Sequence, residues 1–154
     1  MVNKIKSLFL DTSVFGGYYD EIFMRETRLL FDKIKAGKYN VFISDLVEKE
    51  LKKAPENVKN LLNEINYNLI DVTTECENLA DEYIKEKVVG KTSRDDCIHI
   101  ATATIFKIDY LISWNYKHIL RAEKTEGYNS VNLKNGYKHL DIHSPREMEV
   151  YDDK

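Results

Sequence analysis

The sequence predicts one domain of the α/β class, a three-layer α/β/α arrangement around a mostly parallel sheet of about five strands. Short apolar runs alternate with longer segments in which apolar residues recur at helical spacing. Strands separated by helical crossovers pair in parallel, with helices on both faces of the sheet. A chain of 154 residues suits one compact core, so we expect a single domain over residues 1–154.

The first half of the chain alternates strand and helix. The expected elements are a strand at 5–10, a helix at 21–36, a strand at 39–44, helices at 45–53 and 58–65, and a strand at 68–72. The strands are short apolar runs, whereas the helices carry apolar stripes. Gly37 is a stop signal for the helix before it, and Pro55 separates the two consecutive helices.

The second half continues the alternation. The expected elements are helices at 74–88 and 94–106, a strand at 109–113, a helix at 117–123, a polar loop at 129–135, a strand at 139–143 and a final short helix. Gly90 ends the first of these helices, and the helix at 94–106 is apolar on most sides, which predicts a buried position. Ser144 and Glu147 match a capping box, with Pro145 at the first helical position.

Composition is typical of a globular protein, with 43% apolar and 32% charged residues. No apolar run approaches the roughly 20 residues of a membrane span, and the first apolar run ends too early for a secretory signal. Cys76 and Cys97 lack metal-ligand spacing and do not form a disulfide framework, so we expect a cytoplasmic protein without a membrane partner. Because the net charge is −3, any nucleic-acid binding requires a local basic patch.

Asp11 is the most informative residue, because it follows the first predicted strand directly. Open α/β sheets bind their ligands outside the carboxyl ends of the strands, where this carboxylate is expected. An aspartate at this position also simply turns the chain or caps the next helix. Glu50 has a similar pair of interpretations, since it lies on a charged helix but leans toward the apolar residues Leu46 and Ala54.

Two further carboxylates, Asp95 and Asp96, begin the predicted buried helix. Acids in a first turn favour the positive end of a helix and need no other reason to be there. Asp96, however, shares a face with Ile100 and Ala103, so its carboxylate is expected to point into the protein or into a cleft. Asn115 follows the fourth strand as Asp11 follows the first, although a turn explains it almost equally well.

These residues offer oxygen ligands without a convincing cluster of Cys or His. Hard oxygen ligands suit Mg²⁺ or Mn²⁺ rather than zinc. Carboxylates brought close together repel each other unless a cation compensates them, so such a cluster makes sense chiefly as a metal site. His99 and His118 are more often packed or surface histidines than ligands.

The motifs, in order, resemble those of the PIN domain family and particularly its VapC-like toxins. The matching stretches are residues 8–14 (LFLDTSV), 43–51 (ISDLVEKEL), 96–103 (DCIHIATA) and 110–118 (YLISWNYKH), and 142–147 (IHSPRE) is familiar from a PIN-like subgroup. The resemblance spans nearly the whole chain. It implies the strand order 3-2-1-4-5 and a ribonuclease dependent on Mg²⁺ or Mn²⁺.

The resemblance also assigns roles to individual residues. It places the catalytic, metal-binding acids at Asp11, Glu50 and Asp96, with Asp95 and Asn115 as further metal ligands. Ser13 and Ser113 would support these ligands by hydrogen bonds. Lys91 and Arg94 could meet the RNA backbone, and Lys49, Lys52 and Lys53 could form another edge of the groove, although lysines more often form an ordinary solvated surface. Many relatives carry an aspartate where this chain has Asn115, which leaves open whether one metal or two would bind.

The resemblance implies the toxin half of a type II toxin-antitoxin pair, with an RNA substrate, a small antitoxin partner and a homodimer. The alternative is a catalytically weak PIN-like module that binds nucleic acid or protein. A third class, the aspartyl-phosphate proteins, is disfavoured because Ser13 stands where a phosphatase D-x-D motif has its second acid. A nucleotide-binding P-loop is also not present in the sequence.

Overall fold

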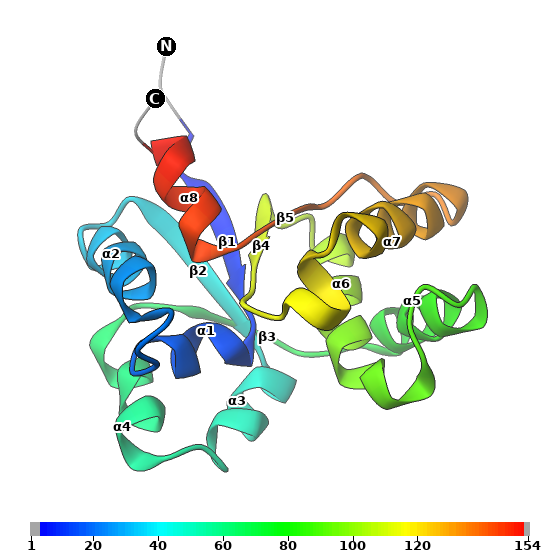
Figure 1. Ribbon diagram of the computed structural model, residues 1–154. Helices are drawn as coiled ribbons and strands as arrows, with labels where there is room; N and C mark the ends of the chain where they lie inside the picture. Colours follow the sequence, from blue (N-terminus) through cyan, green and yellow to red (C-terminus); the bar gives the residue numbers. More distant parts are fainter. Residues whose placement is uncertain (1–3, 153–154) are drawn as a thin grey trace.

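The computed structural model describes residues 4–152 and contains one five-stranded sheet (Figure 1). All neighbouring strands pair in parallel, and the strand order is β3-β2-β1-β4-β5, which confirms the predicted α/β/α fold class. The strands are β1 (Lys6–Leu10), β2 (Tyr39–Ser44), β3 (Asn68–Ile70), β4 (Tyr110–Ile112) and β5 (Asp141–His143).

The pairing register brings the carboxyl ends of the central strands together. Leu10 of β1 is paired with Ile112 of β4, and Phe9 is paired with Phe42 of β2. The backbone N–H of Asp11 still donates to the carbonyl oxygen of Ile112, at 3.2 Å, so the acid begins where the ladder ends. Residues that follow β1 and β4 are therefore neighbours in space.

Helices cover both faces of the sheet. In Figure 1, α1, α2 and α8 lie on one side, and α5, α6 and α7 lie on the other. The α-helices are α1 (Thr12–Gly17), α2 (Met24–Lys35), α3 (Asp45–Leu51), α4 (Glu56–Lys59), α5 (Thr74–Lys85), α6 (Arg94–Ile105), α7 (Ala122–Lys134) and α8 (Pro145–Asp152). Short 3₁₀ turns follow α4 (Asn60–Glu64) and precede α6 (Lys91–Ser93). None of the helices in the described part of the chain has the length and apolar character needed to span a bilayer.

The core consists of the strands and the helix faces that pack on them. β1 is the centre of the sheet, and its residues Leu8, Phe9 and Leu10 are fully buried. α6 is buried from Cys97 to Thr104, as its apolar sequence predicts. The predicted capping box of α8 is also present: the N–H of Glu147 donates to Ser144 Oγ, and the N–H of Ser144 donates to the Glu147 carboxylate.

The polar loop predicted at 129–135 is wrong, because residues 129–134 belong to α7 and Asn135 is its C-cap. Asn129 and Asn132 are buried, and core hydrogen bonds satisfy them. Asn129 bonds both the N–H and the carbonyl oxygen of Leu140, and Asn132 accepts a hydrogen bond from Tyr83. The structure also has a short helix, α1, directly after Asp11, which the sequence analysis did not predict. The helix predicted at 117–123 is present as a π-helix at Tyr116–Leu120.

Candidate active site

Three of the predicted acids reach the carboxyl end of the sheet from separate elements. Asp11 is the N-cap of α1, Glu50 lies on α3, and Asp96 lies in the first turn of α6. All three are in electrostatic contact with one side chain, that of His99. Segments that are far apart in the sequence therefore share one charged centre.

Asp11 is buried, with 3% of its surface exposed, and both of its carboxylate oxygens accept hydrogen bonds from serines. Ser13 Oγ donates to Oδ1 and Ser113 Oγ donates to Oδ2, each at 2.6 Å. These contacts agree with the supporting role that the sequence predicted for the two serines. Burial raises the pKa of Asp11, and the serines and His99 oppose that rise only in part.

Backbone amides fix the orientation of both serine hydroxyls. The N–H of Trp114 donates to Ser13 Oγ at 2.9 Å, and the N–H of Asn115 donates to Ser113 Oγ at the same distance. Each hydroxyl therefore accepts from the chain after β4 and donates to Asp11. This arrangement ties the position of the acid to the backbone of the neighbouring strand.

His99 is the site residue that the sequence analysis missed. Its ring is buried, and Nε2 lies 3.0 Å from Glu50 Oε1, which also accepts a hydrogen bond from Thr12 Oγ1 at 2.5 Å. Burial alone would lower the pKa of His99, but the hydrogen bond to Glu50 and the charges of Asp11 and Asp96 raise it. Burial would likewise raise the pKa of Glu50, yet the hydrogen bonds from His99 and Thr12 lower it. The acids therefore favour the charged form of His99, whereas its burial opposes that form. Its place three residues after Asp96, on the same helix face, was the available signal.

Asp96 is only partly buried, and its surroundings differ from those of Asp11. Burial raises its pKa and the charge of Glu50 adds to the rise, while His99 and His118 oppose it. Asn115 Nδ2 donates to Asp96 Oδ2 at 3.3 Å. The amide oxygen of Asn115 instead accepts the N–H of His118, so the atom predicted to bind metal is used to hold the turn after β4.

The other predicted residues lie outside this cluster. Asp95 is exposed, and its described interactions are with Arg94 and Asp96 rather than with Asp11 or Glu50. The Arg94 guanidinium bonds Asp81 at 3.0 Å and lies 3.9 Å from Glu77, so its charge is paired within the protein. Lys91 is exposed in the 3₁₀ turn before α6. The roles of these three residues stay predictions.

The donor chemistry suits a hard divalent cation, because the three acids offer only oxygen atoms and carry more charge than His99 compensates. The side chains are not, however, arranged as a ready set of ligands. Within residues 4–152, no three Asp, Glu, His or Cys side chains are placed to hold one metal ion. Glu50 is turned toward His99, so binding a metal through all three acids requires local rearrangement.

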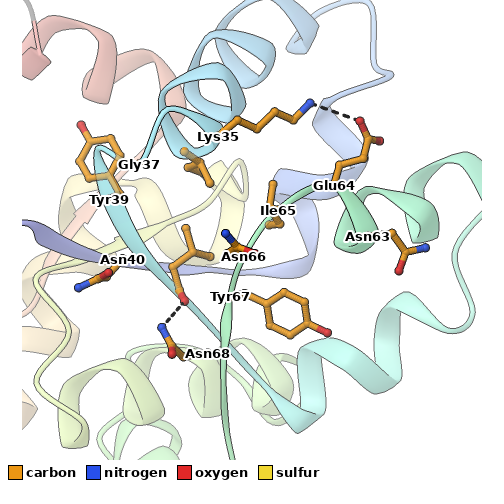
Figure 2. A pocket seen from close by; sticks show the side chains of 12 residues that line it. Lys35, Gly37, Tyr39, Asn40, Asn63, Glu64, Ile65, Asn66, Tyr67 and Asn68 are labelled. Carbon is orange, nitrogen blue, oxygen red and sulfur yellow. Dashed lines mark hydrogen bonds and ion pairs between the residues drawn. The ribbon is translucent and has the colours of Figure 1, made fainter.

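A cavity of about 460 Å³ lies at the opposite, amino end of the sheet (Figure 2). It contains none of the predicted site residues, and amides and tyrosines dominate its lining: Tyr39, Asn40, Asn63, Asn66, Tyr67 and Asn68. Figure 2 shows its one lysine, Lys35, paired with Glu64 across the cavity, at 3.3 Å. The charged cluster and this neutral cavity are therefore at different ends of the molecule.

No protein-family model matches the sequence, and no curated protein matches it significantly. Solved structures do resemble it. VapC20 of Mycobacterium tuberculosis, described as a toxin that cleaves the sarcin-ricin loop, superposes with a TM-score of 0.55 and 16% identity over 71% of this chain and 91% of its own.

Two further structures agree. VapBC2 of Rickettsia felis, bound to a DNA fragment from its promoter, gives a TM-score of 0.51 and 15% identity over 90% of this chain and 98% of its own. A toxin-antitoxin complex of Klebsiella pneumoniae gives a TM-score of 0.54 and 18% identity over 76% of this chain and 93% of its own. At these identities the likeness concerns the fold, and in that respect this chain has the PIN-like fold of the VapC toxins, as its sequence predicted.

Proposed function

We propose that the protein is an endoribonuclease dependent on Mg²⁺ or Mn²⁺, and that it is the toxin of a type II toxin-antitoxin pair. One observation carries the proposal: Asp11, Glu50 and Asp96 come from three separate segments and meet around His99 at the carboxyl end of the sheet. Likeness to VapC folds, two of them from toxin-antitoxin complexes, supports the substrate class and an antitoxin partner. The homodimer and the cytoplasmic location remain predictions.

In this proposal Asp11, Asp96 and Glu50 hold the cation. When bound, it supplies a water of lowered pKa and offsets the charge of the phosphate. The protein's own part is positioning: Ser13 and Ser113 orient both oxygens of Asp11, and Thr12 orients Glu50. His99 keeps the acids together before the cation arrives, because its positive charge reduces their mutual repulsion.

RNA cleavage with Mg²⁺ or Mn²⁺, compared with cleavage in chelator, tests the proposal. We expect cleavage only with metal, and its loss in Asp11→Asn. Asp109→Asn is a matched control, because Asp109 directly precedes β4 and bonds Ser7 of β1, at the other end of the sheet from Asp11. Equal cleavage in chelator and in Asp11→Asn would refute the proposal.

The second candidate function is a catalytically weak module that binds nucleic acid or protein. It is favoured by the orientation of Asn115 and by the lack of three preformed ligands in the described residues. Metal titration distinguishes the two candidates. Saturable binding that Asp96→Asn removes supports the enzyme, and no binding at millimolar metal supports the module.

A further inference from the structure

A second cavity, of about 480 Å³, opens beside the acid cluster, and its size lies in the usual range for ligand pockets. We call it the lysine pocket. It is formed by the exposed side of α3, the chain after β3, α5 and α6, and its lining residues are Asp45, Leu46, Lys49, Lys52, Val72, Glu77 and Ile98. None of these residues belongs to the cluster around His99.

The charged residues of the lysine pocket are two acids and two lysines, and only the acids have partners within the protein. Asp45 accepts a hydrogen bond from the N–H of Val72 at 3.0 Å, and Glu77 lies 3.9 Å from the Arg94 guanidinium. Both acids therefore have a partner within the protein but keep their negative charge. Lys49 and Lys52 are exposed and have no ion-pair partner among residues 4–152. Their ammonium groups are therefore free to meet an external anion.

The lining of the pocket is otherwise apolar. Ile98 is 5% exposed, and Leu46 and Val72 are half-buried. An apolar surface with two free ammonium groups at its rim matches the chemistry of a nucleotide, which has a flat base and a charged phosphate. A small inorganic anion would not use the apolar lining, and a wholly apolar ligand would not use the two lysines.

The lysine pocket and the acid cluster use adjacent residues of the same two helices. On α3, Lys49 precedes Glu50, and Lys53 is near enough to Glu50 to help lower its pKa. On α6, Ile98 precedes His99. Because consecutive helical residues point about 100° apart, pocket and cluster occupy neighbouring faces of these helices. A single bound strand can therefore reach both.

We propose that the lysine pocket binds a nucleotide of the RNA next to the phosphate that is cleaved, with its base on the apolar floor and its phosphate at Lys49 and Lys52. The inference rests on the proposed function and deepens it. It predicts that RNA binding depends on these two lysines more than on Arg94, whose charge Asp81 already occupies.

The test measures binding of a labelled single-stranded RNA to the Asp11→Asn chain, which leaves the RNA intact, as a function of salt. Lys49→Gln with Lys52→Gln should weaken binding and reduce the slope of log affinity against log salt by about 0.7, the value for the loss of one phosphate contact on a single strand. The matched control is Lys38→Gln with Lys107→Gln, two exposed lysines at the amino end of the sheet. This control changes the net charge equally and should leave the slope unchanged.

Leu46→Ser should weaken binding without changing the salt slope, because it removes only contact with the base. Thermal melting of every variant shows whether it is folded. Equal affinities and slopes in the two double-lysine variants would overturn the inference but leave the nuclease proposal intact. A protein segment, rather than RNA, would then be the expected ligand of the pocket. Failure of the parent chain to cleave RNA and of Asp11→Asn to bind it would overturn both.

Discussion

The two ends of the sheet use the same residue types on the same two strands, yet their chemistry differs. At the amino end, Asp109 accepts the N–H of Ser7 at 2.8 Å, and Ser7 Oγ accepts the N–H of Asp109 at 2.8 Å. That pair satisfies itself and joins β1 to β4. At the carboxyl end, Asp11 also bonds to serines, but it is buried, and the charges of Asp96 and His99 act on it.

The comparison shows that an acid next to a serine does not by itself indicate a site. Asp109 is half-buried and bonds to a backbone amide and to the hydroxyl of the same serine. Asp11 is buried, the charges of His99 and Asp96 act on it, and side chains hold both of its oxygens. The two cavities differ in a similar way. Lys35 of the amino-end cavity is paired with Glu64, whereas Lys49 and Lys52 of the lysine pocket have no ion-pair partner among the described residues.

The largest expected effect separates the two acids by function. Asp11→Asn should lower RNA cleavage by about 10²- to 10³-fold, the loss typical for one group that stabilises charge in a transition state. Asp109→Ala should leave cleavage unchanged but reduce the free energy of unfolding by about 1 to 3 kcal/mol, because it leaves the N–H of Ser7 without its acceptor. Rates with Mg²⁺ and urea unfolding curves measure the two effects. A loss of cleavage in Asp109→Ala at unchanged stability would contradict the division.

The second prediction concerns pH and metal. Burial raises the pKa of Asp11 and Asp96 above 3.8, and the acids raise that of His99 above 6.5 despite its burial. Between the ordinary and the raised values the folded state binds more protons than the unfolded state, so stability without metal falls as pH rises. Glu50, with its lowered pKa, acts in the opposite direction only below 4.5.

Metal should reverse this trend, because it binds the deprotonated acids. At 100 times its Kd, Mg²⁺ adds about 2.7 kcal/mol to the free energy of unfolding. The gain should be larger at about pH 8 than at about pH 5, and Asp11→Asn should remove it. Thermal melts at both pH values, with Mg²⁺ and with chelator, measure it. A gain that is the same in Asp11→Asn would place the metal elsewhere.

The third prediction concerns a substitution that disturbs the packing of Trp114 near the carboxyl end of the sheet and changes none of the acids. A Cβ at Gly17 would lie 2.6 Å from Trp114 Nε1 and 2.9 Å from Thr27 Oγ1, atoms that bond each other at 2.8 Å. Gly17→Ala should therefore cost about 1 to 3 kcal/mol of stability. Gly16→Ala, where nothing lies within 4 Å, should gain about 0.5 to 1 kcal/mol in the same helix. Equal melting temperatures would mean that Trp114 shifts freely.

The smallest effect is expected at the amino end. Lys35→Gln removes the ion pair across the cavity of Figure 2, but the pair is exposed, so stability should change by less than about 1 kcal/mol. RNA binding should not change, in contrast to the loss expected for Lys49 and Lys52. Calorimetry and the salt titration together check this. Loss of RNA binding in Lys35→Gln would show that the RNA reaches both ends of the sheet.

Patterns local in the sequence predicted most of the fold. The run before Asp11 specifies β1 because a short apolar segment ended by a polar residue has few other stable conformations, and the all-round apolar α6 had to be buried. The prediction of a loop at 129–135 was wrong because polar residues were assumed to be exposed to solvent. Asn129 and Asn132 are buried, since partners distant in sequence satisfy their amides.

The sequence predicted those site residues whose placement follows from the backbone, and it did not predict those whose role depends on side-chain contacts. Asp11 follows β1, and its contact with Ser113 follows from the pairing of β1 with β4. His99 was missed because its role depends on Glu50, 49 positions away, turning toward it. The orientation of Asn115 was not predictable, because either end of an amide can face Asp96.

The hydrogen bonds of Ser13 and Ser113 restrict which side chains those positions tolerate. Each hydroxyl accepts a hydrogen bond from a backbone N–H and donates one to Asp11, so a replacement must do both with one atom. Threonine satisfies that requirement, whereas alanine leaves an amide and a carboxylate oxygen without partners.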